Sequence, residues 1–132
     1  MIAYDDSFDP PAIVVPAVLS GVVHAQPVVN VQAVIDTGAD ITAIPEHLAE
    51  SLRLFSFSRI QMEDARGNKA PVFTYEAKVG VLDRGSVILE VILAPFPFAV
   101  LGRDWLSEYY LLLNGPDQQF LLSESPLVTE NR

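Results

Sequence analysis

Two apolar stretches of this chain end in similar short motifs, and the first motif carries a group that can do chemistry. Residues 33–36 read Ala-Val-Ile-Asp, and residues 99–102, about half the chain later, read Ala-Val-Leu-Gly. Aspartate and glycine are common in turns, so a turn is the simplest interpretation of each motif. A charged, unpaired aspartate is unfavourable at a buried strand end, however. A turn also does not explain why two apolar strand ends have the same pattern of residues. The carboxyl group of Asp36 is therefore the first candidate for a reactive group.

Asp36 is suited to hydrolysis if a second carboxylate lies beside it. Two carboxylates a few Å apart cannot both ionise, so they share one proton. The ionised member then takes a proton from a water molecule, while the protonated member donates to the carbonyl oxygen of a peptide bond. The second motif carries Gly102 where the first carries Asp36, so the second carboxylate must come from another copy of the chain across a two-fold axis. Thr37 is then placed to hydrogen-bond across this axis, and the Gly38 amide is placed to reach the carboxylate.

The elements that must position these motifs are short strands separated by turn residues. Apolar and β-branched runs predict about eight strands, over residues 13–19, 28–35, 42–44, 55–62, 72–82, 87–93 and 98–101 and in a terminal hairpin within 111–122. Two short helices are expected within residues 45–52 and 103–110. This pattern predicts an all-β domain with a closed or rolled sheet. Pro16 lacks an amide donor, so its strand is expected at a sheet edge or with a bulge.

The distribution of polar residues predicts three parts. Residues 1–11 are expected to form an acidic flexible arm, residues 12–122 one folded domain, and residues 123–132 a polar tail. Within the domain, Arg66-Gly67-Asn68 separates two strand-like runs and predicts a hairpin turn.

The composition disfavours several classes of partner. The chain has 132 residues, a net charge of −9 and no cysteine. The negative charge argues against nucleic acid and anionic membranes as partners, and the lack of cysteine excludes disulfides and thiolate metal sites. The first residues lack the basic region of a signal peptide, and charge and prolines interrupt the longest apolar stretch, residues 87–100. A cytoplasmic location is therefore expected. Because half of the residues are hydrophobic, a buried subunit interface or an apolar groove is also expected.

Residues 35–40 (Ile-Asp-Thr-Gly-Ala-Asp) and 100–104 (Val-Leu-Gly-Arg-Asp), with the order of elements between them, resemble the retropepsin family of dimeric, retroviral-type aspartic proteases. The resemblance covers roughly residues 13–122. It implies a single-lobe acid-protease barrel in a two-fold homodimer, with Asp36 as the catalytic aspartate. It also implies that Thr37 and Gly38 support the catalytic loop and interlock the subunits, and that Arg103 forms an ion pair with Asp40. The residues implied in substrate binding are Gly38, Ala39, Asp40, Ala43, Ile44 and Val100, together with Arg66, Gly67 and Asn68 in a flap hairpin.

Two features depart from the viral members of that family. The viral flap is glycine-rich, whereas here Gly67 is the single glycine in the turn, and this chain has extra residues at both ends. Both features are more similar to the cellular and bacterial relatives.

Other interpretations of the same residues are weaker. Asp36, Asp40 and Asp104 can in principle hold a divalent cation, but the stretch lacks the alternating carboxylates of a calcium loop. A phosphorylated aspartate would lack a phosphate-binding motif beside it, and His24 and His47 lack a metal-ligand context. The sequence thus predicts a homodimeric endopeptidase that cleaves extended peptides without a cofactor or metal, fastest at mildly acidic pH. The competing hypothesis is a catalytically silent module of the same fold that dimerises or binds peptides.

Overall fold

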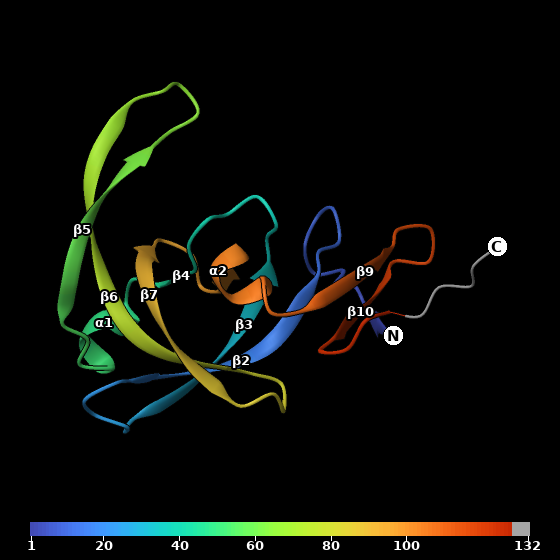
Figure 1. The fold of residues 1–132 in the computed structure, drawn as a ribbon, viewed down its shortest axis with the longest axis horizontal. Coiled ribbons are helices and arrows are strands. Elements are labelled where there is room, and N and C mark those ends of the chain that lie inside the picture. The colour runs from blue at the N-terminus through green and yellow to red at the C-terminus, as the bar shows by residue number, and fades with distance from the viewer. Residues whose placement is uncertain (128–132) are drawn as a thin grey trace.

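The computed structural model describes residues 1–127 and consists mainly of strands (Figure 1). Six strands form a closed barrel in the order β2, β3, β8, β4, β7 and β6, and β6 returns to pair with β2. Their bounds are Val14–Gly21 (β2), Val28–Ile35 (β3), Ala43–Pro45 (β4), Lys69–Val81 (β6), Ser86–Ala94 (β7) and Ala99–Leu101 (β8). The prediction of an all-β domain with a closed sheet is confirmed.

The remaining elements of the barrel domain are one long hairpin and two short helices. β5 (Ser56–Glu63) pairs with the first half of β6, and the resulting hairpin projects from the barrel (Figure 1). Helices α1 (Leu48–Ser51) and α2 (Arg103–Leu106) are each four residues long, shorter than the sequence predicts. Helices of this length are not stable alone, and both bury side chains against the barrel. No helix in the described part of the chain is long and apolar enough to cross a membrane.

The interior of the barrel is filled by alternate residues of its strands. In β2, the side chains of Val15, Ala17 and Leu19 are buried, and β3 buries Ala33 and Ile35 at its carboxyl end. The core therefore anchors β3 up to the residue that precedes Asp36.

The prediction that Pro16 marks an edge strand or a bulge is wrong. β2 pairs with β3 on one side and with β6 on the other, in an unbroken register. Pro16 lies opposite Gln32 of β3, and the pairing with β6 begins at the next residue, Ala17. The Pro16 carbonyl accepts a hydrogen bond from the Leu82 amide. The missing proline amide thus falls just outside the doubly paired stretch and leaves the barrel closed.

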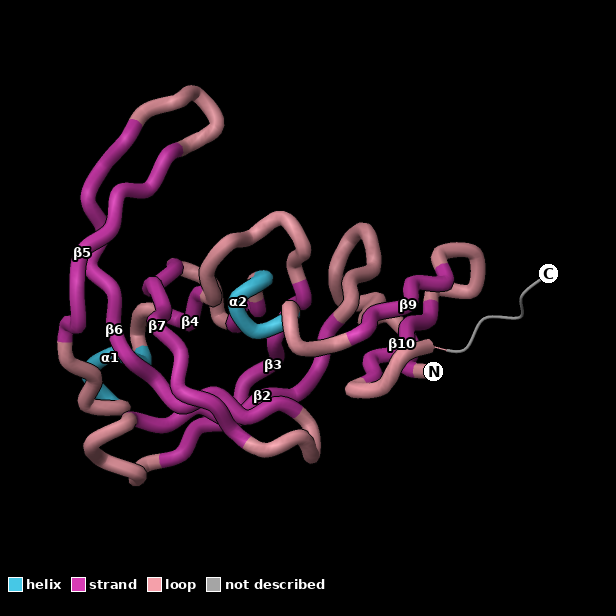
Figure 2. The backbone as a smooth tube through the Cα atoms, viewed as in Figure 1, coloured by secondary structure: helices cyan, strands magenta, loops and turns pink. Residues whose placement is uncertain are grey.

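A second sheet joins the two ends of the described chain and lies at the opposite end of the molecule from the β5–β6 hairpin (Figures 1 and 2). β1 (Ile2–Ala3) pairs with β10 (Gln119–Ser123), and β10 pairs with β9 (Tyr110–Asn114). Asp5 forms a further bridge with Ala12. These parts of the arm that we expected to be flexible are therefore paired with other segments. β1 is only two residues long, which is too short for a strand to be predicted from the sequence pattern. Of the expected tail, Ser123 belongs to β10, and residues 128–132 lie outside the described residues.

Candidate active site

The two motifs found in the sequence lie side by side in the structure. The end of β3 runs parallel to β8, with residues 33–35 opposite residues 99–101. The Asp36 amide then donates a hydrogen bond of 3.0 Å to the Leu101 carbonyl. Asp36 and Gly102 are therefore equivalent positions at the ends of two neighbouring strands, which explains the repeat.

The carboxylate of Asp36 is held from within its own loop. The Gly38 amide donates a hydrogen bond of 2.8 Å to Oδ1 of Asp36. A Cβ added to Gly38 would lie 3.2 Å from the same oxygen, so glycine permits this close approach. Burial ends at Ile35, which is 5% exposed, whereas Asp36 and Thr37 are exposed in the single chain. One chain therefore does not bury the carboxylate as the apolar run suggested, because the barrel encloses β3 only as far as Ile35.

Arg103, at the start of α2, holds residues 36–41, called here the Asp36 loop. The Arg103 amide donates a hydrogen bond of 2.8 Å to the Ala39 carbonyl, and Nη1 donates one of 2.8 Å to the Thr37 carbonyl. Its Nη2 forms an ion pair with Asp40, the pair that the family resemblance implies. Both side chains of this pair are more than half exposed, so the pair itself adds little stability. The two bonds to backbone carbonyls are what fix the shape of the loop.

No side chain fits at Gly102. A Cβ there would lie 2.9 Å from the Ala39 carbonyl oxygen and 2.9 Å from the Ile41 carbonyl carbon, which is closer than packed atoms approach one another. Glycine thus lets the Asp36 loop pack directly against the start of α2. The lack of a second carboxylate at this position is a packing requirement of the fold.

Sequence reasoning missed a hydrogen-bond network behind the loop. Thr42 is fully buried, and its Oγ1 donates a bond of 2.7 Å to Oδ1 of Asp104 and accepts one of 3.2 Å from the Gly102 amide. The amides of Thr42 and Trp105 also donate to the Asp104 carboxylate, at 2.9 and 2.8 Å. The sequence signal for this role was an acid in the first turn of a helix, directly after the second motif.

The same hydrogen bonds give Asp104, considered above as a possible metal ligand, a structural role. Its carboxylate oxygens are used by hydrogen bonds within the fold. Across residues 1–127, no group of three or more His, Cys, Asp or Glu side chains is arranged to hold a metal ion.

The Asp36 loop borders a cleft of about 490 Å³ between the barrel and the projecting hairpin. Six of the predicted site residues line this cleft: Asp36, Gly38, Ala39, Asp40, Ala43 and Val100. The residues that sequence reasoning did not name come from the hairpin and from β7 and the segment after it: Ile60, Gln61, Met62, Glu63, Ile92, Ala94 and Phe96, with Ile41 from the loop. Thr37 and Ile44 are not among the lining residues, and Ile44 is fully buried because neighbouring strand residues face opposite sides.

The predicted turn at Arg66-Gly67-Asn68 forms the tip of the β5–β6 hairpin (Figure 2). Asp64 organises it, because its Oδ1 accepts hydrogen bonds from the Asn68 and Arg66 amides at 2.9 and 2.8 Å. These bonds, that from Asn68 first, hold the pKa of Asp64 below its ordinary value. Gly67 has φ of 83°, in the left-handed region that favours glycine. The three turn residues do not line the cleft; the wall is formed lower in the hairpin, by residues 60–63.

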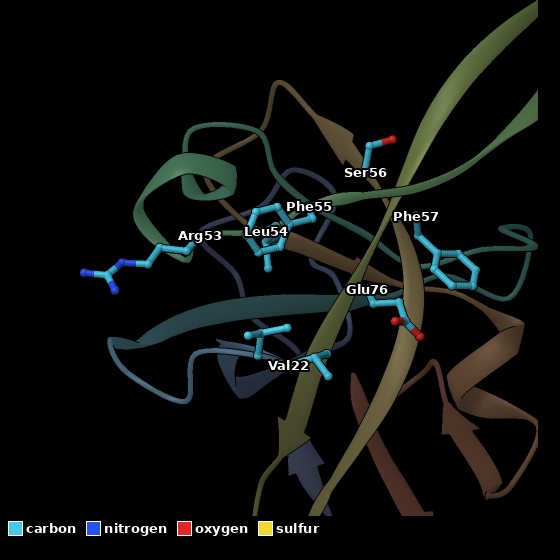
Figure 3. Close-up of a pocket in the computed structure, with 8 residues that line it drawn as sticks. Val22, Arg53, Leu54, Phe55, Ser56, Phe57 and Glu76 are labelled. Carbon is cyan, nitrogen blue, oxygen red and sulfur yellow. The ribbon is translucent and has the colours of Figure 1, made fainter.

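A second, smaller cavity of about 110 Å³ lies at the base of the same hairpin (Figure 3). Its lining combines apolar side chains with a few polar ones: Val22, Val23, Leu54, Phe55 and Phe57 with Arg53, Ser56 and Glu76. In Figure 3 the Arg53 side chain points away from the others. This lining contains one carboxylate, that of Glu76, among mainly apolar side chains.

Solved structures share this fold at low sequence identity. The protease of simian foamy virus (mac) is 22% identical with a TM-score of 0.53, and the match covers 72% of this chain and 96% of the viral one. A foamy viral protease-reverse transcriptase in complex with an RNA/DNA hybrid is 21% identical with a TM-score of 0.54 over 74% of this chain, which spans 12% of that longer chain. A retropepsin-like aspartic protease from Rickettsia conorii is 18% identical with a TM-score of 0.53, covering 92% of this chain and 88% of the bacterial one. These viral and bacterial proteins thus share the fold of this chain.

Sequence comparisons give the family. No curated protein matches the chain. The model of a family described as retroviral aspartyl protease matches residues 16–114, a range that runs from β2 to β9 and includes both motifs. Together with the parallel pairing of the two motifs in a closed barrel, this match shows that the chain belongs to the retroviral aspartyl protease family.

Proposed function

We propose that this chain is an aspartic endopeptidase that acts as a homodimer, with Asp36 of each subunit supplying one of two catalytic carboxylates. The observation that carries the proposal is the placement of Asp36. Asp36 is exposed at the end of a strand that is anchored in the core, its carboxylate accepts a hydrogen bond from the Gly38 amide, and it lines a cleft large enough for side chains of a peptide. A carboxylate that only capped a turn would not need this cleft.

Dimerisation follows from the number of carboxylates. Gly102 occupies the equivalent strand end and has no room for a side chain, so the second acid comes from a second copy across a two-fold axis. The backbone of Thr37 is held by Arg103 through its carbonyl, which leaves the exposed hydroxyl to hydrogen-bond with its mate at the axis. Association would bury the two carboxylates, which the single chain leaves exposed.

In this dimer the two Asp36 carboxylates share one proton, since two like charges a few Å apart cannot both persist. The ionised carboxylate accepts a proton from a bound water molecule, and the water oxygen attacks the carbonyl carbon of the scissile peptide bond. The protonated carboxylate donates its proton to the carbonyl oxygen. Collapse of the tetrahedral intermediate transfers a proton to the leaving nitrogen and breaks the C–N bond. The reaction requires no cofactor or metal.

The substrate would lie extended in the cleft, paired through its backbone with the Asp36 loop and the hairpin. Gly38, Ala39, Asp40, Ala43 and Val100 line the cleft; the first three would contact the substrate backbone, and the last two would border its side chains. The turn residues Arg66, Gly67 and Asn68 do not line the open cleft, so they would reach substrate only when the hairpin closes as a flap. Apolar side chains beside the cleaved bond are favoured, because most of the cleft wall is apolar.

A mixing experiment tests the shared site. Wild-type protein is mixed with increasing amounts of Asp36→Asn protein, allowed to exchange subunits, and assayed on a peptide mixture by mass spectrometry. If each site needs one Asp36 from each subunit, activity per wild-type chain should fall as the inactive variant is added. The matched control is Asp83→Asn, which removes an exposed acid from the turn between β6 and β7 and should leave the activity unchanged.

Three outcomes separate the alternatives. Activity per wild-type chain that is independent of added Asp36→Asn protein would rule out the shared site. Cleavage by pure Asp36→Asn protein at the wild-type rate would rule out Asp36 as the catalytic acid. Peptide binding without any turnover by the wild type would favour the catalytically silent module.

A further inference from the structure

The charged residues that line the cleft are all acidic. They are Asp36, Asp40 and Glu63, and no lysine, arginine or histidine is among the lining residues. Two of these acids already have a use. Asp36 is the proposed catalytic group, and Asp40 is paired with Arg103. Glu63 is the cleft carboxylate that has no part in the proposed chemistry.

Glu63 ends β5, close to the tip of the hairpin. A Cβ added to Gly67 would lie 3.8 Å from its Oε1, so the carboxylate sits beside the turn that would close over substrate. Lys69 lies opposite Glu63 in the β5–β6 ladder but does not line the cleft. Among residues 1–127, the Glu63 carboxylate has no hydrogen bond and no ion-pair partner within 4.0 Å. The carboxylate is therefore not held in an ion pair, and a basic ligand would compete only with Lys69, its neighbour across the ladder.

The cleft around Glu63 suits a lysine or arginine side chain, which combines an apolar stem with a charged head. Lysine and arginine place an aliphatic stem along apolar surface and keep the charged head at a polar group. Glu63 lines the same cleft as Ile92 and Phe96, so these apolar side chains can accompany the stem while Glu63 receives the head. A carboxylate that receives a guanidinium can accept two parallel hydrogen bonds, which adds geometric selection to the charge. An acidic side chain at the same place would be repelled.

We infer that Glu63 is a specificity-determining residue that selects substrates carrying an arginine or lysine near the cleaved bond. The inference rests on the proposed endopeptidase function and narrows its substrate class to peptides with a basic residue beside apolar ones. Glu63 lies on the β5–β6 hairpin rather than on the Asp36 loop. It would therefore affect the choice of substrate and leave the proton transfers unchanged.

Matched peptides test this assignment. Each pair differs by arginine or its neutral isostere citrulline, placed in turn at every position on either side of the scissile bond, and kcat/KM is measured for each peptide. The wild type should prefer arginine by about fivefold at one or more positions, the size expected for a partly exposed ion pair. Glu63→Gln should bring that ratio close to one, and Glu63→Lys should make the same position prefer glutamate over glutamine.

A control variant separates the local effect from the overall negative charge of the chain. Glu50→Gln removes the same formal charge from an exposed site on α1, outside the cleft, and should keep the wild-type ratio. An unchanged ratio in Glu63→Gln, or an equal drop in Glu50→Gln, would overturn the inference.

Binding to an inactive variant keeps the test independent of catalysis. Fluorescently labelled peptides of the same pairs are titrated into Asp36→Asn protein and into Asp36→Asn/Glu63→Gln protein. Tighter binding of the arginine peptide that depends on Glu63 would support the inference even if no peptide is cleaved, a result that would count against the endopeptidase proposal alone. Equal binding of both peptides to the two proteins, with cleavage of both by the wild type, would refute the inference and leave the endopeptidase proposal standing.

Discussion

The ends of β3 and β8 have similar local structure, but the aspartates that follow them differ in burial and in hydrogen bonding. Both strands run parallel, both end at an equivalent position, and each is followed by an aspartate within a short distance. After β3, Asp36 is exposed and accepts a bond from one nearby amide, of Gly38. After β8, Asp104 is partly buried and accepts bonds from Thr42 and from the Trp105 amide. The comparison indicates that a carboxylate with few internal partners is free for chemistry, whereas a carboxylate with several holds the site in shape.

The largest expected effect comes from exchanging each of these two aspartates for asparagine. Asp36→Asn should reduce kcat/KM by about 10³-fold or more, because the variant cannot share and transfer the proton. Its melting temperature should fall less than that of Asp104→Asn, because Asp36 accepts one internal hydrogen bond, from the Gly38 amide, which the asparagine oxygen can still accept. Asp104→Asn should instead lower the melting temperature, because it weakens charge-assisted hydrogen bonds behind the loop. Peptide kinetics and thermal unfolding on the same samples check both halves, and a large stability loss in Asp36→Asn would break the comparison.

Gly102 tests how tightly the two strand ends are packed together. Gly102→Ala places a Cβ 2.9 Å from the backbone of the Asp36 loop, and overpacking of this kind costs about 3 kcal/mol. We expect a lower free energy of unfolding in urea, together with lower activity because the loop is displaced. Gly115→Ala is the matched control, since a Cβ there meets nothing within 4 Å. Equal stability of the two variants would show that the Asp36 loop can shift to accommodate the added methyl group at little cost.

Thr42 tests the network that holds Asp104. Thr42→Val keeps the shape of the fully buried side chain but removes a donor to Asp104 and an acceptor for the Gly102 amide. Leaving these groups unsatisfied should reduce the free energy of unfolding by about 2 kcal/mol. Thr42→Ser keeps the hydroxyl and should lose less. If valine and serine are equally well tolerated, the network contributes nothing measurable.

The smallest expected effect concerns Asp64, an exposed acid that organises a turn rather than a reaction. Its pKa lies below the ordinary value of 3.8 because the Asn68 and Arg66 amides bond to the ionised form. The lowered pKa means that the carboxylate supports the turn fully above pH 3.8 and loses this support as the pH falls through the lowered value. NMR shifts of the two amides should therefore change together below about pH 4, and Asp64→Asn should remove the change. A titration of these amides that is the same in the variant would assign it to another group.

The sequence predicted the elements better than their partners. Alternating and apolar runs located the barrel strands, because the period of side chains along a strand is local information. The motif around Asp36 also identified the loop at the cleft. Strand pairing is not local, so neither the parallel contact of β3 with β8 nor the bond between Thr42 and Asp104, 62 residues apart, could be read from spacing. Pro16 misled for the same reason, since a proline is compatible with an internal strand when the second pairing begins just after it.

The cleft shows the same limit at the level of single residues. Ala43 and Ile44 were both predicted to bind substrate, yet Ala43 lines the cleft whereas Ile44, the next residue along the strand, is buried in the core. The cleft wall from β5 was missed because nothing in residues 60–63 distinguishes them from any other hairpin. Only the closed barrel brings that hairpin over the Asp36 loop.

The steric closure of Gly102 also limits the routes by which this chain can evolve. Placing a second acid at the equivalent strand end would give one chain both carboxylates, and a single codon change from glycine to aspartate would be enough on paper. The backbone of the Asp36 loop occupies the space that such a side chain needs. In the proposed mechanism, a point mutation at Gly102 therefore does not free the chain from its second subunit. Linking two copies of the chain in one polypeptide would supply both Asp36 carboxylates and leave the packing at Gly102 unchanged.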